Sequence, residues 1–240
     1  QWLALDKPTD VLPEAHRWYP ERPDLLAALN EQVAAEKPEL APLEIAKAGS
    51  VYKAEPEVSG VLLLATGEEA YKGLRDAYGS GLFTFTFQFL AKDDGGKAER
   101  TCELPLAMHR TQPRGLVSHE SGKKCVTHFR RLERLGGFGW WEARTTYVRT
   151  HQIRLHAAEV DLPIVGDRLY RGPKPIMLSD LKRDYRSRGE ESPLYRGLCL
   201  HLGGLEVAAP DWAFTLESPL PKGFNVLLSR IRRHLGEKRH

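Results

Sequence analysis

The segment Val148–His156 carries the side chains with the greatest capacity for chemistry in this chain. It places two arginines, two histidines and a glutamine beside the apolar Val148, Ile153 and Leu155. Guanidinium groups suit phosphate or carboxylate partners because their donors match two oxygens at once. The segment therefore predicts an anchored element that aims cationic groups at an anionic partner. The alternative interpretation is a half-buried strand with one solvated face.

The composition is that of an ordinary globular protein, with 41% hydrophobic and 28% charged residues among 240. The longest apolar run, residues 60–65, is far too short to cross a bilayer, so no membrane association is expected. The three cysteines, Cys102, Cys125 and Cys199, form no C-x-x-C pattern, and no H-E-x-x-H pattern occurs. We therefore expect free thiols in a reducing cytoplasm and no metal site.

Charge is distributed unevenly along the chain. Residues 1–75 carry 13 acidic and 8 basic side chains, which leaves 27 of the 35 basic and 19 of the 32 acidic residues for the remainder. A basic C-terminal two-thirds favours a polyanionic partner, although solvated surface charge explains most such asymmetries.

The spacing of apolar residues predicts both strands and helices, and hence an α+β fold. Four phenylalanines alternate with polar residues over residues 83–89, which indicates a half-buried strand. A helix is expected after Pro23, a second after a capping box formed by Thr66 and Glu69, and a last one over residues 224–235. Residues 3–7 are expected to form a short strand that Pro8 ends.

Several of these segments resemble one enzyme family. Residues 149–156, RTHQIRLH, followed by PIVGDRLY at 163–170, are similar to the signature of the RluA-like pseudouridine synthases, which isomerise uridine in RNA. Residues 58–65 resemble the family's T-S-G-L-L-L-L-A run, and family-like segments extend from about residue 3 to residue 235. The resemblance implies a mixed, largely antiparallel central sheet flanked by helices. It also implies a single catalytic domain over residues 1–240, with a polar insertion at about 173–195.

The family's reaction needs a carboxylate beside the sugar and a base that has left the RNA stack, but no cofactor and no metal. The family supplies the carboxylate as the Asp of an H-R-L-D-x-x-T/V-S-G motif. Alignment on residues 58–60 places Glu55 at this position, while Tyr52, Lys53 and Ala54 stand in place of His, Arg and Leu. The resemblance thus implies Glu55 as the catalytic acid residue, in a departure from the family pattern.

Two further catalytic positions follow from the resemblance. Phe87 stands where the family places a pocket tyrosine, so it could stack on uracil but offers no hydroxyl for proton handling. Arg154 stands where a basic residue pairs with the carboxylate, and an Arg154–Glu55 pair is expected. One extra methylene moves the carboxylate by roughly 1 Å, and a misplacement of that size can cost about a hundredfold in rate.

Lys53, Arg149, His151 and Gln152 are the residues expected to contact RNA. For the last three, the alternative is a structural network that ties the loop to the sheet. Asp167 is expected to cap the turn at Gly166.

The sequence is best explained as an RNA-binding member of the RluA-like family whose isomerase activity is lost or much reduced. One alternative is an active pseudouridine synthase that uses Glu55, and another is a protein–protein scaffold that does not bind RNA. The expected partner is structured RNA, ribosomal or transfer RNA, and the expected protein is a cytoplasmic monomer without cofactor or metal.

Overall fold

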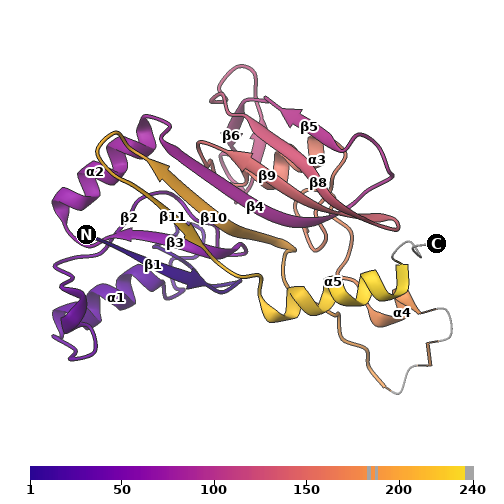
Figure 1. Ribbon diagram of the computed structural model, residues 1–240, viewed down its shortest axis with the longest axis horizontal. Coiled ribbons are helices and arrows are strands. Elements are labelled where there is room, and N and C mark those ends of the chain that lie inside the picture. Colours follow the sequence, from indigo (N-terminus) through magenta and orange to yellow (C-terminus); the bar gives the residue numbers. More distant parts are fainter. Residues whose placement is uncertain (183–184, 187–188, 236–240) are drawn as a thin grey trace.

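One mixed sheet forms the frame of the molecule (Figure 1). The computed structural model of the protein describes residues 1–182, 185–186 and 189–235. In chain order the elements are β1 (Trp2–Lys7), α1 (Leu25–Ala34), the 3₁₀ turn η1 (Ala41–Leu43), β2 (Gly49–Ser50), β3 (Ser59–Ala65), α2 (Glu68–Gly79), β4 (Phe83–Lys92), β5 (Glu99–Cys102), β6 (Leu106–Met108), β7 (Gly115–Val117), β8 (Thr127–Leu135), β9 (Phe138–Thr145), α3 (Gln152–Glu159), α4 (Leu178–Leu181), β10 (Leu200–Ala208), β11 (Ala213–Glu217) and α5 (Lys222–Leu235).

The main sheet has the strand order β1-β3-β10-β4-β9-β8-β5, and β2 and β11 pair with β3 and β10. Among the described strands, β3 and β10 are paired in parallel through residues 59–60 and 201–202, and every other named pair is antiparallel. These pairings confirm the predicted α+β fold with a mixed, largely antiparallel sheet and flanking helices.

Strand β4 lies in the middle of the sheet, and its side chains alternate between buried and partly exposed over residues 83–88. Its four phenylalanines, Phe83, Phe85, Phe87 and Phe89, are all buried, as the sequence predicts. Because side chains alternate between the two faces of a strand, the polar residues between them lie on the opposite face. The phenylalanine face of β4 therefore belongs to the core, which extends to Trp141 of β9.

The helices begin and end near their predicted positions, with two corrections. Asp24 caps α1 by accepting a hydrogen bond from the Ala27 N–H at 2.8 Å. The predicted capping box before α2 is wrong: Gly67 is the N-cap, and the Thr66 hydroxyl is buried without a hydrogen-bond partner among the described residues. The strand interpretation of Val148–His156 is also wrong, because α3 begins at Gln152.

A glycine permits the parallel contact at the centre of the sheet. Gly60 has a φ of +116°, and a Cβ atom at this position would lie 2.1 Å from the Leu202 carbonyl oxygen. Only glycine avoids this clash, because it has no Cβ and adopts positive φ freely. The close approach of β3 to β10 fixes the loop before β3, which carries Glu55.

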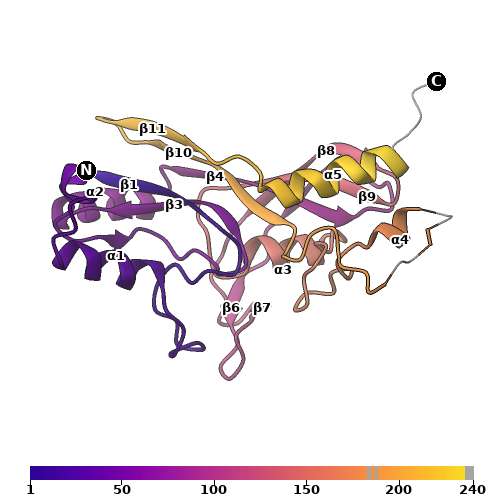
Figure 2. The same ribbon diagram turned by 90° about the horizontal axis from the view of Figure 1, so that it is seen from below.

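Two loop segments project from the same side of the sheet as α3 (Figure 2). One is the hairpin of β6 and β7, and the other is the connection between β1 and α1. Met108 of the hairpin and residues 13–18 of the connection line one cavity together. The two segments therefore flank the region in which Glu55 lies.

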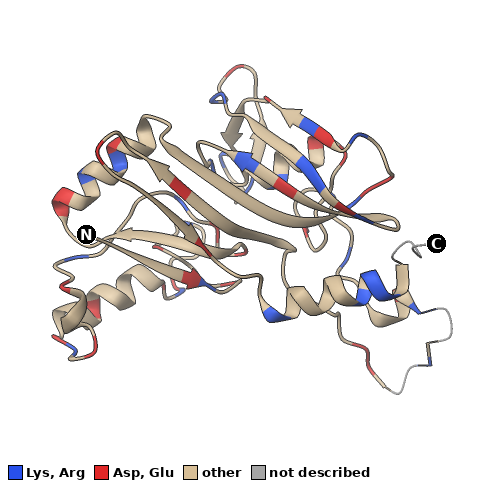
Figure 3. Ribbon diagram, viewed as in Figure 1, with Lys and Arg blue, Asp and Glu red and all other residues tan. Residues whose placement is uncertain are grey.

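The C-terminal part of the chain packs beside the sheet. The predicted last helix is α5, which buries Phe224, Leu227 and Ile231 and carries basic residues toward both of its ends (Figure 3). Within the predicted insertion at 173–195, α4 spans four residues, while residues 183–184 and 187–188 lie outside the described ones. None of the described helices has both the length and the apolar character required to span a membrane.

Candidate functional site

Glu55 is a buried carboxylate in the loop between β2 and β3. Its Oε1 accepts a hydrogen bond from the backbone N–H of His151 at 2.8 Å, and its Oε2 lies 3.2 Å from Nη1 of Arg154. The ion pair expected from the sequence is therefore present. Both carboxylate oxygens are engaged by α3 and the residue just before it.

Arg154 is the centre of an acidic cluster. Its Nε and Nη2 donate to the two oxygens of Asp167 at 2.8 and 2.9 Å, and its Nη1 also lies 3.6 Å from Glu57. Such a two-point contact fixes the plane of the guanidinium group. Asp167 Oδ1 also accepts from the N–H groups of Leu169 and Tyr170, so it caps the turn, as predicted, and orients Arg154 as well.

His151 links the carboxylate to the β6–β7 hairpin. Its backbone lies in the left-handed region with a φ of +61°, which directs its N–H at Glu55. Its Nδ1 lies 2.8 Å from the Tyr170 hydroxyl, which in turn accepts from the N–H of Gly115 at 2.7 Å. Non-glycine residues in this backbone region persist only where their surroundings hold them, and such positions cluster at functional sites.

Phe87 and Glu55 line one small cavity, together with Val148, Leu202 and Lys7. Its volume is about 20 Å³, which is room for about one water molecule. A larger cavity of about 270 Å³ lies on another side of Glu55, under residues 13–18.

Burial governs the protonation of this cluster. It raises the pKa of Glu55, while the charge and hydrogen bond of Arg154 and the His151 N–H act to lower it and the nearby charge of Asp167 adds to the rise. Burial also lowers the pKa of Lys7 to about 8, although nearby acids oppose the change. The Lys7 ammonium donates to three backbone carbonyls, including that of Pro56 at 2.9 Å, so it supports the Glu55 loop.

The four residues predicted to contact RNA lie in different surroundings. Lys53 is exposed and lines all three cavities around the site, and Arg149 lines the largest of them. His151 is buried but borders the 270 Å³ cavity. Gln152 is fully buried, and its amide nitrogen lies within hydrogen-bonding distance of Thr127, Thr145 and the Val126 carbonyl, which favours the structural alternative for this residue.

Glu55, Glu57 and His151 also bring possible metal-ligating atoms within 4.8 Å of one another. The Arg154 guanidinium, however, lies 3.2 and 3.6 Å from the Oε2 atoms of the two glutamates. A fixed positive charge at this distance opposes a second cation at the same oxygens. The cluster is therefore better suited to an organic substrate than to a metal ion.

Sequence patterns missed several residues of the site. Lys7, Tyr170 and the Arg154 contact of Asp167 are all tertiary features. Asp167 and Tyr170 belong to the 163–170 segment that carries the resemblance, and Lys7 is the last residue of the first strand, followed by Pro8. The Arg154–Asp167 pair could have been predicted from the sequence, because Arg154 lies in the 149–156 segment and Asp167 in the adjacent 163–170 segment.

Because of His151, we predict that the folded protein becomes less stable as the pH falls. Burial, together with the charge of Arg154, lowers the pKa of His151 from 6.5 to about 4. Between these pH values the unfolded chain binds a proton at this residue that the folded chain does not bind, so the free energy of unfolding falls as the pH drops. The contribution of His151 is about 3 kcal/mol between pH 6.5 and pH 4.

His151→Asn isolates this contribution, because asparagine tolerates left-handed backbone but does not titrate. Urea unfolding of both proteins from pH 7 to pH 4 should show the pH slope reduced in the variant. Buried His156 and His201, whose pKa values burial also lowers, are unchanged in both proteins and cancel in the comparison. Parallel pH curves would contradict the prediction.

Comparison with known proteins places this chain in a family, although no family model matches it. The chain is 30% identical over 181 residues to an uncharacterized RNA pseudouridine synthase of Zymomonas mobilis, a match that covers 74% of the chain and 75% of the relative. It is 26% identical over 241 residues to an uncharacterized RNA pseudouridine synthase of Synechocystis, with 98% and 68% covered.

A third relative is considerably longer than the matched region. Ribosomal large subunit pseudouridine synthase D of Haemophilus ducreyi is 31% identical over 136 residues, which cover 55% of the chain. The chain thus spans 41% of the length of this relative and 58% of that of its counterpart from Haemophilus influenzae.

Solved structures show the same architecture. Human RNA pseudouridylate synthase domain containing 4 aligns with a TM-score of 0.71 and 17% identity over 96% of this chain and 90% of that one. Human RNA pseudouridylate synthase domain containing 1 aligns with a TM-score of 0.61 and 18% identity, with 92% and 80% covered. The likeness confirms the predicted pseudouridine synthase fold, and together with the sequence relatives it shows that the chain belongs to the RluA-like family of RNA pseudouridine synthases.

Proposed function

We propose that this chain is an RNA-binding member of the family whose isomerisation of uridine to pseudouridine is lost or much reduced. The observation that carries the proposal is the identity and setting of residue 55: a glutamate stands where the family pattern has aspartate, and its carboxylate is held at both oxygens by the His151 N–H and Arg154. The proposed catalytic residues are Glu55, Phe87 and Arg154.

The length of the Glu55 side chain determines where its carboxylate can lie. A glutamate is one methylene longer than the aspartate of the family motif, and Pro56 restricts Glu55 to extended backbone. The side chain is held by the His151 N–H and by Arg154 rather than being free to retract. Covalent attack on a sugar, or removal of its proton, depends on placement to within about 0.5 Å. The retained ion pair therefore keeps Glu55 ordered without restoring the position of the shorter acid.

The cavity that Glu55 shares with Phe87 is small. Phe87 and Val148 line it, and its volume is about 20 Å³. Glu55 also lines the adjoining cavity of about 270 Å³. Phe87 could still stack on a base, but it has no hydroxyl with which to accept or donate a proton.

RNA binding is supported by the basic residues around this site. Lys53 is exposed at the junction of the three cavities, and Arg149 and His151 line the two larger ones. A concave basic surface raises the local concentration of a polyanion and lowers its dissociation rate. This charge arrangement is the reason to prefer RNA binding over the scaffold alternative.

The active alternative rests on one specific observation. Arg154 is oriented by Asp167 and pairs with Glu55, which is the arrangement that a working carboxylate needs. If the loop of residues 13–18 and Val148 shift when RNA binds, Glu55 could reach the sugar. The activity measurement below separates this alternative from the proposal.

We also propose that residues 1–240 form one catalytic-type domain that acts as a monomer on ribosomal or transfer RNA. The three cysteines are free and buried, which suits a reducing cytoplasm. No cofactor is invoked, because the family's reaction moves a base within one nucleotide without a change of oxidation state.

The proposal predicts that the unchanged chain binds structured RNA but forms pseudouridine at less than about a hundredth of the rate of an active family member. Binding is measured by fluorescence anisotropy against transfer and ribosomal RNA at increasing salt, and pseudouridine by nucleoside analysis of the same RNA. Binding should weaken steeply with salt because it depends on phosphate contacts. Absence of salt-dependent binding would favour the scaffold, and rapid turnover would favour the active enzyme.

A further inference from the structure

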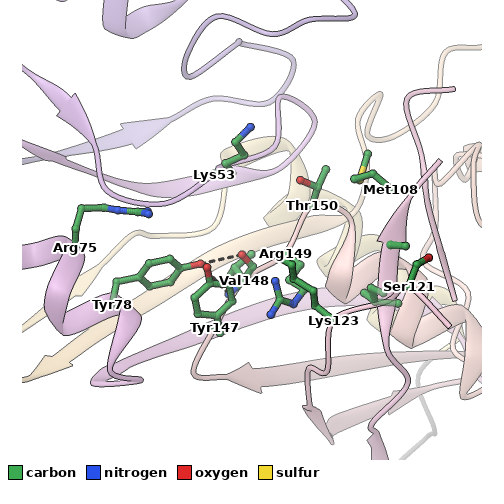
Figure 4. Close-up of a pocket in the computed structure, with 12 residues that line it drawn as sticks. Lys53, Arg75, Tyr78, Met108, Ser121, Lys123, Tyr147, Val148, Arg149 and Thr150 are labelled. Carbon is green, nitrogen blue, oxygen red and sulfur yellow. Dashed lines mark hydrogen bonds between the residues drawn. The ribbon is translucent and has the colours of Figure 1, made fainter. Parts of the chain in front are cut away.

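The largest cavity beside the candidate active site is a basic cleft of about 420 Å³ (Figure 4). We name it the Arg–Tyr cleft, after Lys53, Arg75, Tyr78, Lys123, Tyr147 and Arg149. Four of its lining residues are cationic, and no acidic residue is among those that line it in the described part of the chain. Lys53, Met108 and Thr150 also line the 270 Å³ cavity that borders Glu55, so the two cavities adjoin.

Two tyrosines hold the arginines of this cleft in place. The rings of Tyr78 and Tyr147 stack with centroids 4.3 Å apart and planes 16° apart. The Arg149 guanidinium lies 4.8 Å over the Tyr147 ring, and that of Arg75 lies 5.6 Å from the centre of Tyr78. Figure 4 shows Tyr78 and the Arg149 guanidinium on opposite sides of the Tyr147 ring.

Backbone hydrogen bonds make this stack rigid. The Tyr78 hydroxyl donates to the Val148 carbonyl at 2.9 Å, and Arg75 Nη1 donates to the Val51 carbonyl at 2.7 Å. The Arg149 N–H donates to the buried Gln152 amide at 3.0 Å. The order of the cleft thus depends on the same segment that positions Glu55.

Both rings of the stack already have partners. Tyr147 contacts the Tyr78 ring and the Arg149 guanidinium, while Tyr78 is buried and makes edge contacts with Phe83 and Phe85. Aromatic rings bind single-stranded RNA by stacking on bases, which requires an open face. In this cleft the rings instead support guanidinium groups, whose donors match phosphate oxygens.

We propose that the Arg–Tyr cleft binds backbone phosphates of the RNA strand beside the nucleotide that reaches Glu55, and that it reads no base. Arg75 and Arg149 are the phosphate-binding residues, and Tyr147 is a positioning residue that acts through Arg149. The inference rests on the proposed function, because it assigns the RNA contacts of that same site. Lys53, which both cavities share, lies where the strand passes from one cavity to the other.

The test measures the salt dependence of binding to a short single-stranded RNA by fluorescence anisotropy. Arg75→Gln and Arg149→Gln should each weaken binding and reduce the slope of log K against log salt by about 1, as loss of one phosphate contact does. Arg230→Gln on the exposed face of α5 removes a charge of the same kind outside the cleft and should leave the slope unchanged. Equal slopes for all three variants and the unchanged protein would overturn the proposal.

Tyr147 variants separate positioning from stacking. Tyr147→Phe keeps the ring and should bind as the unchanged protein does, whereas Tyr147→Ala should lose slope as Arg149→Gln does. Single abasic nucleotides are then placed in turn along the RNA. Removal of the base from the nucleotide in the cleft should not change the affinity of the RNA for the unchanged protein or for Tyr147→Phe. If removal of that base weakens binding to the unchanged protein but not to Tyr147→Ala, the base stacks on Tyr147 and the proposal is overturned.

The two levels of the proposal fail differently. If the unchanged protein does not bind RNA at all, the proposed function is wrong and the cleft assignment falls with it. If the unchanged protein binds RNA with a steep salt slope that the cleft variants do not alter, the proposed function stands and the cleft assignment alone is wrong. Arg75 is exposed on α2, so its variant removes a charge at the surface of the cleft, together with the hydrogen bond from Nη1 to the Val51 carbonyl.

Discussion

Glu55→Asp should raise the rate of pseudouridine formation in bulk cellular RNA about a hundredfold above that of the unchanged protein. The shorter side chain withdraws the carboxylate by roughly 1 Å and enlarges the cavity that Phe87 and Val148 restrict. Arg154 remains held by Asp167 in this variant, so the partner of the carboxylate stays in place. The measurement is nucleoside analysis of RNA incubated with each protein, with RNA binding recorded in parallel.

Glu55→Gln is the matched control, because it keeps the length of glutamate but removes its charge. It should form no pseudouridine while binding RNA as the unchanged protein does. Turnover by the unchanged protein that disappears in Glu55→Gln would show that glutamate serves as the catalytic acid residue and would reject the proposed loss of activity. If Glu55→Asp binds RNA but forms no pseudouridine, the loss of activity would be due to the small cavity that Phe87 and Val148 line rather than to the position of the carboxylate.

Asp167→Ala should lower the free energy of unfolding by about 3–5 kcal/mol, because it leaves a buried guanidinium without its two-point partner. Asp167 is 2% exposed and Arg154 is 3% exposed, so water cannot replace the lost contacts. The N–H groups of Leu169 and Tyr170 lose their acceptor in the same variant. Urea unfolding followed by circular dichroism measures the change.

Asp167→Asn separates the ion pair from the turn. Its amide oxygen, in place of Oδ1, can still accept from Leu169, Tyr170 and Arg154 Nη2, but its NH₂ group takes the place of Oδ2 and meets the Arg154 Nε–H, so this variant should remain strongly destabilised. Asp211→Ala, at an exposed position in the turn between β10 and β11, should change the free energy of unfolding by less than about 0.5 kcal/mol. If Asp167→Asn were as stable as the Asp211 control, the ion pair would contribute nothing.

Elements with strong local periodicity could be predicted well. The phenylalanines of β4, the helix after Pro23 and the final helix all place apolar side chains at the repeat of their own element. The start of α2 could not be placed by the same means, since Gly67 rather than Thr66 caps it. Helix termini depend on backbone geometry at one residue, which apolar spacing does not encode.

The sequence by itself determined the family and the fold, because ordered motifs run along almost the whole chain and each reflects local spacing. It also identified Glu55 and Arg154 as partners, through resemblance alone. Only the tertiary structure decided that Gln152 is buried in a polar network, that Asp167 orients Arg154, and that two tyrosines in the Arg–Tyr cleft support arginines. Glu55 and Arg154 are 99 residues apart, and contacts at such separation follow from how strands and helices pack rather than from any local pattern.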